Sequence, residues 1–258
     1  MVHDHDIGIS TGAYYELSLG TALLRIAELA PSAEILSLGR HSLLEPINVR
    51  VIEAAGLPFT VHGPFAHFEF GSRSAAKHQG AIELHRRHMW VAAELGAELY
   101  VVHPDMQRRA RGWDQRIADS LELAFEQLSA LQDEIGLPTA VENMPFSKHS
   151  HFVAPGDLDL KGLGLVLDTG HAAMTGTLGE WLNDPLANLR HVHLHDNQGH
   201  LGGDRHDALG TGVVDIEPIL DAARAAGASI VLEHKDEASV IASLHHLRTR
   251  GLLVRDLG

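Results

Sequence analysis

The residues with the clearest chemistry lie in one histidine-rich stretch, LRHVHLHDNQGHLGGDRHDALGTG. Its first part alternates apolar residues with histidines, and this period of two is typical of a β-strand. The period places His191, His193 and His195 on one face of that strand. The loop that follows carries Asp204 and His206. Imidazoles and carboxylates gathered in this way need charge compensation, and a divalent metal ion would supply it.

Residues of the same kinds end five other strand-like segments, which read TVH, YVVH, TAVE, VLD and IVLE. With the stretch above, six consecutive segments each end in an imidazole or a carboxylate. The candidate metal ligands are His62, His103, Glu142, Asp168, His171, His195, Asp204, His206 and Glu233. Such ligands without cysteine suit Zn²⁺, Mn²⁺, Fe²⁺ or Co²⁺. A catalytic ion takes about three or four protein ligands, so we expect one to three ions per chain.

The elements that must position these residues alternate along the chain, a strand-like segment followed by a helix-like one, eight times. The strand-like segments are 6–11, 33–38, 59–62, 98–103, 139–143, 164–168, 189–196 and 229–234. The helix-like segments are 18–29, 46–55, 74–95, 113–135, 155–162, 178–182, 215–226 and 237–250. This alternation predicts the α/β class, as one closed (β/α)₈ TIM barrel over residues 1–258. A doubly wound sheet is the alternative, but no glycine-rich phosphate fingerprint follows the first strand.

The alternation within the strands supports the barrel. The residues two before each strand-end ligand would face the barrel interior, and five of the six are small or β-branched: Thr60, Val101, Ala140, Val166 and Val231, with His193 as the sixth. The residues between would face the helices, and all are aliphatic: Val61, Val102, Val141, Leu167, Leu194 and Leu232. Reactive groups of such barrels lie at the C-terminal ends of the strands, so we expect the metal site at that mouth.

Composition excludes several classes of protein. The length of 258 residues suits a single domain, and the formal net charge of −14 argues against a surface built for phosphate backbones. The absence of cysteine rules out disulfides and thiolate ligands. No apolar run reaches the ~18 residues of a membrane span. The N-terminus, MVHDHDIGIS, lacks the basic and apolar regions of a secretory signal, so we expect a cytoplasmic protein.

The chain resembles the xylose-isomerase-like TIM barrels, the superfamily that joins sugar isomerases and epimerases to endonuclease IV. The resemblance covers nearly the whole chain through the motifs HGPF, HP, EN, LDTGH, HLHD, DRH with LGTG, and LE. The residues it implies for the metal site shared across the superfamily are Glu142, Asp168, His195 and Glu233. Those it implies for a second ion, as in endonuclease IV, are His62 and His103 with a bridging Glu142. Those it implies for a third are His171, Asp204 and His206.

In the interpretation we favour, the chain is an isomerase or epimerase that acts on a small sugar or sugar phosphate through a metal-stabilised enediolate. Two carboxylates beside one metal ion provide a base and an acid, and Glu142 and Glu233 would move the protons. The resemblance to the epimerase branch implies that His171 and Arg205 hold substrate oxygens. Nothing in the sequence excludes an oligomer.

In the alternative interpretation, the chain hydrolyses phosphodiesters at abasic sites in DNA with three zinc ions, as endonuclease IV does. The complete ligand set favours it. The loop GPFAHFEFGSR, however, lacks the tyrosine and asparagine pattern of the endonuclease signature, and HLHDN stands where that family has an Asn–Asp pair. DNA binding also needs a cationic track. The basic cluster on a barrel loop consists of Arg108, Arg109, Arg111 and Arg116. A barrel that binds metal without catalysis is a third interpretation, which an open site disfavours.

Several further residues carry expectations. Phe65, Phe68 and Phe70 would form a lid over the site. Asn143 would orient a ligand or a substrate hydroxyl, and Lys235 would bind an anionic group at the mouth. We interpret the deeper histidines of the histidine-rich strand, His191 and His193, as core imidazoles and not as ligands. The histidines on the third predicted helix, which we expect at the surface, are His78, His85 and His88.

Overall fold

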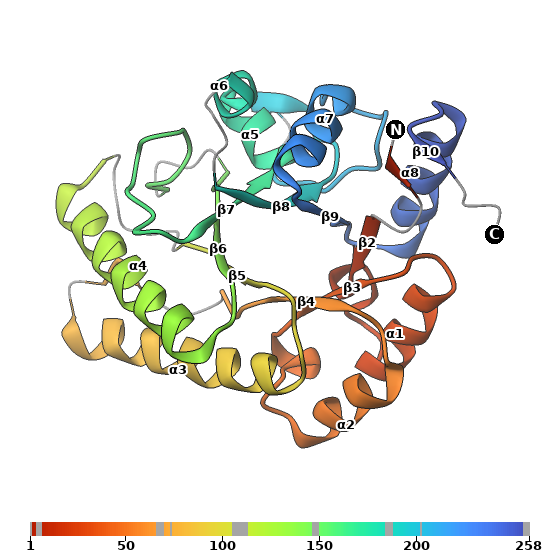
Figure 1. Cartoon of the computed structure of the whole chain (residues 1–258). Coiled ribbons are helices and arrows are strands. Elements are labelled where there is room, and N and C mark those ends of the chain that lie inside the picture. Colours follow the sequence, from red (N-terminus) through yellow and green to blue (C-terminus); the bar gives the residue numbers. More distant parts are fainter. Residues whose placement is uncertain are drawn as a thin grey trace.

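Eight parallel strands form a closed barrel in sequence order, and the last pairs with the first. The computed structural model describes residues 2–3, 7–65, 70–72, 74–104, 113–145, 150–183, 188–201 and 203–254. The barrel strands are β2 (Ile7–Ser10), β3 (Ala33–Leu36), β4 (Phe59–His62), β5 (Tyr100–Val102), β6 (Thr139–Glu142), β7 (Gly164–Asp168), β8 (Leu189–Leu194) and β9 (Ser229–Leu232). Figure 1 shows them as a ring with helices outside it. The fold is the (β/α)₈ barrel that the sequence predicts.

The helices connect consecutive strands across the outside of the ring. They are α1 (Leu19–Ala27), α2 (Pro46–Ala55), α3 (Ala75–Glu94), α4 (Gln115–Ile135), α5 (Thr169–Thr175), α6 (Leu178–Asn183), α7 (Ile216–Ala226) and α8 (Glu237–Thr249). Short 3₁₀ turns, η2 (Thr11–Tyr14), η3 (Gly39–His41) and η4 (Gly199–Leu201), lie in loops. The short strands β1 (Val2–His3) and β10 (Leu253–Val254) pair with each other outside the barrel. No helix among the described residues is long and apolar enough to cross a membrane.

The helix predicted over 155–162 is absent. This segment forms turns, in which the carboxylate of Asp157 accepts hydrogen bonds from the backbone N–H groups of Val153 and Ala154, both at 2.8 Å. Gly156 and Gly162 adopt φ of +82° and +87°, which is incompatible with a helix. A helix that the pattern missed, α5, begins directly after β7, and the side chain of Asp168 caps its first turn.

Burial in the barrel follows the two-sided pattern predicted from the strands. Leu99, Val101, Ala140 and Val166 pack on one another as a small cluster separate from the main core. The alternate residues belong to the main core and are fully buried: Val61, Val102, Val141, Leu167, Leu194 and Leu232. Because each strand is buried on both faces, only the strand ends and loops can present reactive groups to solvent.

Candidate metal centre

The predicted ligands lie at the C-terminal ends of the barrel strands. His62, Glu142 and Asp168 are the last residues of β4, β6 and β7. His103 and Glu233 directly follow β5 and β9. Parallel strands end on the same side of a barrel, so these five side chains meet at one mouth, where (β/α)₈ enzymes hold their active sites.

A cavity of about 450 Å³ opens at this mouth. The candidate ligands that line it are His62, His103, Glu142, His171, Asp204, His206 and Glu233. Apolar side chains, among them Leu36, Leu38 and Phe65, make up much of the remaining wall. The cavity therefore combines a metal-binding region with an apolar surface.

The central cluster consists of Glu142, Asp168, His193 and Glu233, whose facing atoms all lie within 4.8 Å of one another. Nδ1 of His193 lies 3.3 Å from Oε2 of Glu233, 3.5 Å from Oε1 of Glu142 and 3.9 Å from Oδ2 of Asp168. The sequence pattern placed His195 here and treated His193 as a core imidazole. The structure brings His193 to the three carboxylates instead, because His193 is the residue of β8 that pairs with Asp168 in the strand register.

His195 lies beside the central cluster, on the side of His206. Its Nε2 is 3.1 Å and 3.0 Å from the two carboxylate oxygens of Asp168. Its ring stacks on the ring of His206, with centroids 4.1 Å apart. Facing atoms of His195, His206 and Glu233 also lie within 4.8 Å of one another. His195 therefore stays a candidate ligand, for an ion that His206 would share.

A second cluster joins the end of β7 to the loop after β8. Nε2 of His206 lies 3.0 Å from Oδ1 of Asp204, and Nε2 of His171 lies 3.6 Å from the same oxygen. These three residues are the set that the family resemblance assigns to a third ion. The structure brings all three together.

The third group of predicted ligands lies around β4 and β5. Nε2 of His62 is 3.2 Å from Oε2 of Glu142. The ring of His103 is 6.0 Å from that of His62, between centroids. Nδ1 of His103 is buried and has no hydrogen-bond partner among the described residues. Phe65 contacts both imidazoles, with ring centroids 5.4 Å and 5.0 Å away, and so covers this part of the site.

Backbone hydrogen bonds set the tautomer of most of these imidazoles. Carbonyl oxygens lie 2.8, 2.9, 3.2 and 3.0 Å from Nδ1 of, respectively, His62, His171, His195 and His206. A carbonyl oxygen can only accept a hydrogen bond, so Nδ1 donates and Nε2 keeps its lone pair in the neutral ring. Nε2 faces a carboxylate in all four residues. Nδ1 of His171 and of His206 also lies near a carboxylate oxygen, at 3.3 Å from Glu142 and 3.7 Å from Glu233.

This arrangement fits a bound metal ion. A lone pair and a carboxylate oxygen that face each other at such distances repel unless a proton or a metal ion lies between them. Nδ1 of His193 and Oε2 of Glu233 are buried and, within the described parts of the chain, have no hydrogen-bond partner. A divalent ion would satisfy both atoms. The histidine and carboxylate donors suit Zn²⁺, Mn²⁺, Fe²⁺ or Co²⁺.

Without a metal ion, protons supply the positive charge in the second cluster. Burial lowers the pKa of His171, but the charge of Asp168 and other carboxylates outweighs burial and raises the pKa to about 10. Burial likewise lowers the pKa of His206, and the charge of Glu233 and its neighbours raises it to about 9. At His103 burial dominates and lowers the pKa to about 4, so this imidazole is neutral at physiological pH.

Asn143 positions the ligands at the ends of β6 and β7. Its side-chain Nδ2 donates to the carbonyl of Asp168 at 3.1 Å, and its Oδ1 accepts from the N–H of Asp168 at 2.6 Å. Its own carbonyl accepts from Nδ1 of His171. One amide thus links two ligand-bearing strands and orients one imidazole, in keeping with the predicted role of Asn143 in orienting a ligand.

The loop after β8 is organised by Asp196, a residue that sequence reasoning did not single out. Its carboxylate accepts four backbone hydrogen bonds, from residues 197, 210, 212 and 214, at 2.8 to 3.0 Å. A Cβ on Gly212 would overlap the carbonyl oxygen of Asn197. The sequence signal was the Asp that ends HLHD followed by the glycines of LGTG, which together close the loop that carries Asp204 and His206.

The backbone of His206 is in the left-handed region, with φ of 55°. Such a conformation is uncommon outside glycine and is frequent at functional sites. Two hydrogen bonds hold it, because Nδ1 of His206 donates to the carbonyl of Glu233 at 3.0 Å and Nδ1 of His234 donates to the carbonyl of His206 at 3.1 Å. The two residues that follow β9, Glu233 and His234, therefore orient His206.

The basic residues that the sequence singled out differ in whether they line the cavity. Arg205 is half-exposed, pairs with Asp207 at 3.0 Å, and is not among the residues that line the cavity. Lys235 lines the cavity, and its Nζ donates to the carbonyl of Asp204 at 2.5 Å. The predicted basic cluster at 108, 109 and 111 lies outside the described residues, as does Phe68 of the predicted lid. Phe70 is buried at 1% exposure and does not line the cavity.

The expectation that the histidines of α3 lie at the surface is wrong. His78, His85 and His88 are 8%, 0% and 3% exposed. His85 contacts the hydroxyl of Tyr100 at 3.0 Å, and His78 contacts the side chain of Gln127 at 2.9 Å. His85 and His78 are buried because α3 packs against β5 and α4, where Tyr100 and Gln127 supply their hydrogen-bond partners.

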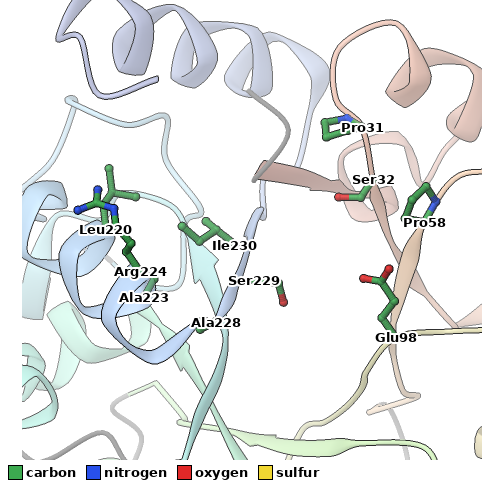
Figure 2. Close-up of a pocket in the computed structure, with 11 residues that line it drawn as sticks. Pro31, Ser32, Pro58, Glu98, Leu220, Ala223, Arg224, Ala228, Ser229 and Ile230 are labelled. Carbon is green, nitrogen blue, oxygen red and sulfur yellow. The ribbon is translucent and has the colours of Figure 1, made fainter. Parts of the chain in front are cut away.

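Another cavity, of about 510 Å³, lies at the opposite, N-terminal end of the barrel. Figure 2 shows Glu98 and Ser229 facing this opening, with Pro58 and Ile230 beside them. Its lining contains no imidazole, and none of the nine predicted ligands. Among the described residues that line cavities, the candidate ligands are therefore found at the C-terminal mouth.

The model of the xylose isomerase-like TIM barrel family matches residues 49–250. The chain belongs to this family. An uncharacterized protein of Methanocaldococcus jannaschii, MJ1311, is 28% identical over an alignment of 268 positions, gaps included, which covers 96% of this chain and 89% of that protein.

Relatives with functional names come from both branches of the family. A probable endonuclease 4 of Mycobacterium leprae is 26% identical over 200 residues, covering 72% of this chain and 77% of that protein. The crystal structure of a D-tagatose 3-epimerase-like protein matches with a TM-score of 0.81 and 25% identity, covering 95% of this chain and 96% of the other. The comparisons therefore agree on the family and include both candidate activities.

Proposed function

We propose that this chain is a divalent-metal-dependent isomerase or epimerase that acts on a small sugar or sugar phosphate. The observation that carries the proposal is the cavity at the barrel mouth. Two carboxylates, those of Glu142 and Glu233, line one space of about 450 Å³ beside an apolar wall. A cavity of this size suits a small molecule.

The central cluster would hold the catalytic ion through His193, Asp168, Glu142 and Glu233. Such an ion polarises carbonyl and hydroxyl oxygens of a bound substrate. Glu142 and Glu233 would take a proton from the carbon beside the carbonyl and return one to the neighbouring position. The side chain of Glu233 is 16% exposed and that of Glu142 only 2%, so Glu233 has the freer approach to the substrate.

The remaining lining residues would bind and orient the substrate. The imidazole of His171 can hold a hydroxyl, and Lys235 can bind a phosphate or another anionic group. Leu36 and Phe65 would pack against the carbon skeleton and exclude water. Arg205, which the family resemblance assigns to substrate oxygens, would have to release Asp207 to reach the cavity.

Phosphodiester hydrolysis on DNA is the second candidate, and a specific observation favours it. The cluster of His171, Asp204 and His206 is complete, and endonuclease relatives match the chain. Against it, Lys235 is the only lysine or arginine among the described residues that line the cavity. The net charge of −14 also opposes binding to a phosphate backbone.

The test is proton exchange at carbon. The Mn²⁺-, Co²⁺- or Zn²⁺-loaded protein is incubated in deuterium oxide with ketoses and their phosphates, and deuterium in recovered sugars is measured by mass spectrometry. We expect incorporation that Glu142→Gln and Glu233→Gln abolish. Glu98→Gln, at the opposite end of the barrel, should leave it unchanged. Cleavage of abasic-site DNA without any deuterium incorporation would contradict the proposal and support the second candidate.

A further inference from the structure

A buried carboxylate lies in the barrel interior directly beneath the central cluster. Glu34, on β3, is 0% exposed. Its Oε2 accepts a hydrogen bond from Nε2 of His193 at 3.3 Å, and its Oε1 lies 3.1 Å from the same nitrogen. The hydroxyl of Thr60 donates to Oε2 at 3.3 Å. A charged side chain at such depth is costly unless it is paired, so its presence needs a physical reason.

The imidazole that Glu34 contacts is reversed relative to the others of the site. His62, His171 and His206 donate through Nδ1 to a backbone carbonyl and present Nε2. His193 has no such carbonyl partner for Nδ1 among the described residues, and it presents Nδ1 to the carboxylates of the central cluster. The contact that distinguishes His193 is the one between its Nε2 and Glu34.

We propose that Glu34 is a positioning residue, which accepts the hydrogen of Nε2 of His193 and thereby fixes Nδ1 as the nitrogen that holds the metal ion. A carboxylate behind a ligating imidazole fixes the tautomer and the ring orientation and makes the nitrogen a stronger ligand. The inference rests on the proposed function only in requiring a metal ion at the central cluster. It holds whichever substrate the site accepts.

The rest of the interior packs Glu34 in place. Nε2 of His191 lies 3.2 Å from Oε2 of Glu34, and Nδ1 of His191 is 2.7 Å from Oγ of Ser229. Ser229 lies at the N-terminal opening of the barrel (Figure 2). A column of four polar side chains thus extends from that opening to the central cluster: Ser229, His191, Glu34 and His193. The ring of His191 packs edge-on against that of His193, and Glu34 is the member that accepts a hydrogen bond from His193.

The test compares metal affinity in variants of Glu34 and of its other neighbours. Glu34→Gln keeps the volume but replaces the carboxylate, and Glu34→Leu removes the acceptor. We expect both to weaken Zn²⁺ binding by about 10- to 100-fold, measured by competition with a chromophoric chelator. Two matched controls, Thr60→Val and Ser229→Ala, each remove one hydrogen bond of the column without touching His193. They should bind Zn²⁺ as the wild type does.

A second measurement separates positioning from a merely structural role. In ¹⁵N-labelled, Zn²⁺-loaded wild type, long-range ¹H–¹⁵N spectra should show His193 protonated at Nε2 and metal-bound at Nδ1, with His193→Asn identifying the signals. In Glu34→Gln, the tautomer of His193 should become mixed. The thermal midpoints of metal-free Glu34→Gln and Ser229→Ala are compared to show whether the change in tautomer is more than a loss of stability. Wild-type zinc affinity in both Glu34 variants, or ligation through Nε2 in the wild type, would overturn the inference.

The outcomes also distinguish this inference from the proposed function. Zinc affinity and ring tautomer are measured without substrate, so they remain informative if no sugar is converted. Weaker zinc binding in the Glu34 variants could also arise if Glu34 itself ligated an ion together with His191 and His193. In that case the wild-type spectra would show that Nε2 of both imidazoles carries no hydrogen. That result would also overturn the inference.

Discussion

Metal binding at the second cluster should depend steeply on pH. Metal-free His171 and His206 titrate with pKa values of about 10 and 9, so both imidazoles are protonated at neutral pH. An ion can bind their Nε2 atoms only after both protons leave. Because these pKa values are raised, the affinity of the cluster rises with pH and levels off only above them.

The magnitude follows from the two pKa values. A pH of about 7.5 lies roughly 2.5 units below the pKa of His171 and roughly 1.5 units below that of His206. Removing both protons at this pH therefore costs about 5 kcal/mol. Between about pH 7 and 9 the apparent affinity should rise by up to about a hundredfold per pH unit, because two protons are exchanged for one ion. The metal affinity of the central cluster should change less with pH, because that cluster contains one imidazole instead of two. A metal ion should therefore occupy the central cluster first at neutral pH.

The assay is titration calorimetry of Zn²⁺ into metal-free protein at several pH values, in pairs of buffers with different ionisation enthalpies. The buffer dependence gives the number of protons released by each ion. We expect about two for the ion of the second cluster, and about one fewer in His206→Ala. Release of no protons and an affinity that does not change with pH would refute the reasoning, because they would show that carboxylates do not hold these imidazoles in the protonated form.

Three further results are expected. Glu142→Gln and Glu233→Gln should each lower turnover by at least about 10²- to 10⁴-fold, since each removes a proton-transfer group, and near-normal turnover in either would contradict the assigned site. His206→Ala should only weaken an isomerase but should nearly abolish a hydrolase that needs a third ion, as steady-state kinetics on each substrate class would show. Gly212→Ala should lower the free energy of unfolding by about 1–3 kcal/mol in denaturant titrations, because the new methyl would overlap the loop backbone. Gly179→Ala, in open space on α6, is the control, and equal effects would contradict this reading of the loop.

Much of the barrel could be predicted from the sequence because its strands and helices depend on patterns of residues that lie close together in the chain. Six of the eight strands are apolar runs with a candidate ligand at or directly after their end, and several helices end near a glycine such as Gly56 or Gly136, which adopt φ of 62° and 77°. The segment 155–162 was mispredicted because its apolar residues resemble a short helix. The decisive interactions there are backbone hydrogen bonds to Asp157, which a periodicity does not register.

The composition of the central cluster was harder to predict, because it depends on register between strands. A period of two puts His193 and His195 on the same face and cannot say which one lies level with Asp168. The register shift between Leu165 and Val166, where β7 meets β8, decides it. Glu34 was missed for a related reason, since its partner His193 is 159 positions away in the chain. Its one sequence signal was a lone acid in an otherwise apolar strand.

The most direct test of the central claim is the metal content of protein purified without chelator and without an affinity tag, measured by elemental analysis. The account predicts about one tightly bound divalent ion per chain near neutral pH, lost in the double variant Glu142→Gln with His193→Asn. Three zinc ions per chain would instead support the phosphodiester hydrolase. A chain that carries no ion, and binds neither Zn²⁺, Mn²⁺, Fe²⁺ nor Co²⁺ when they are supplied, would contradict the account.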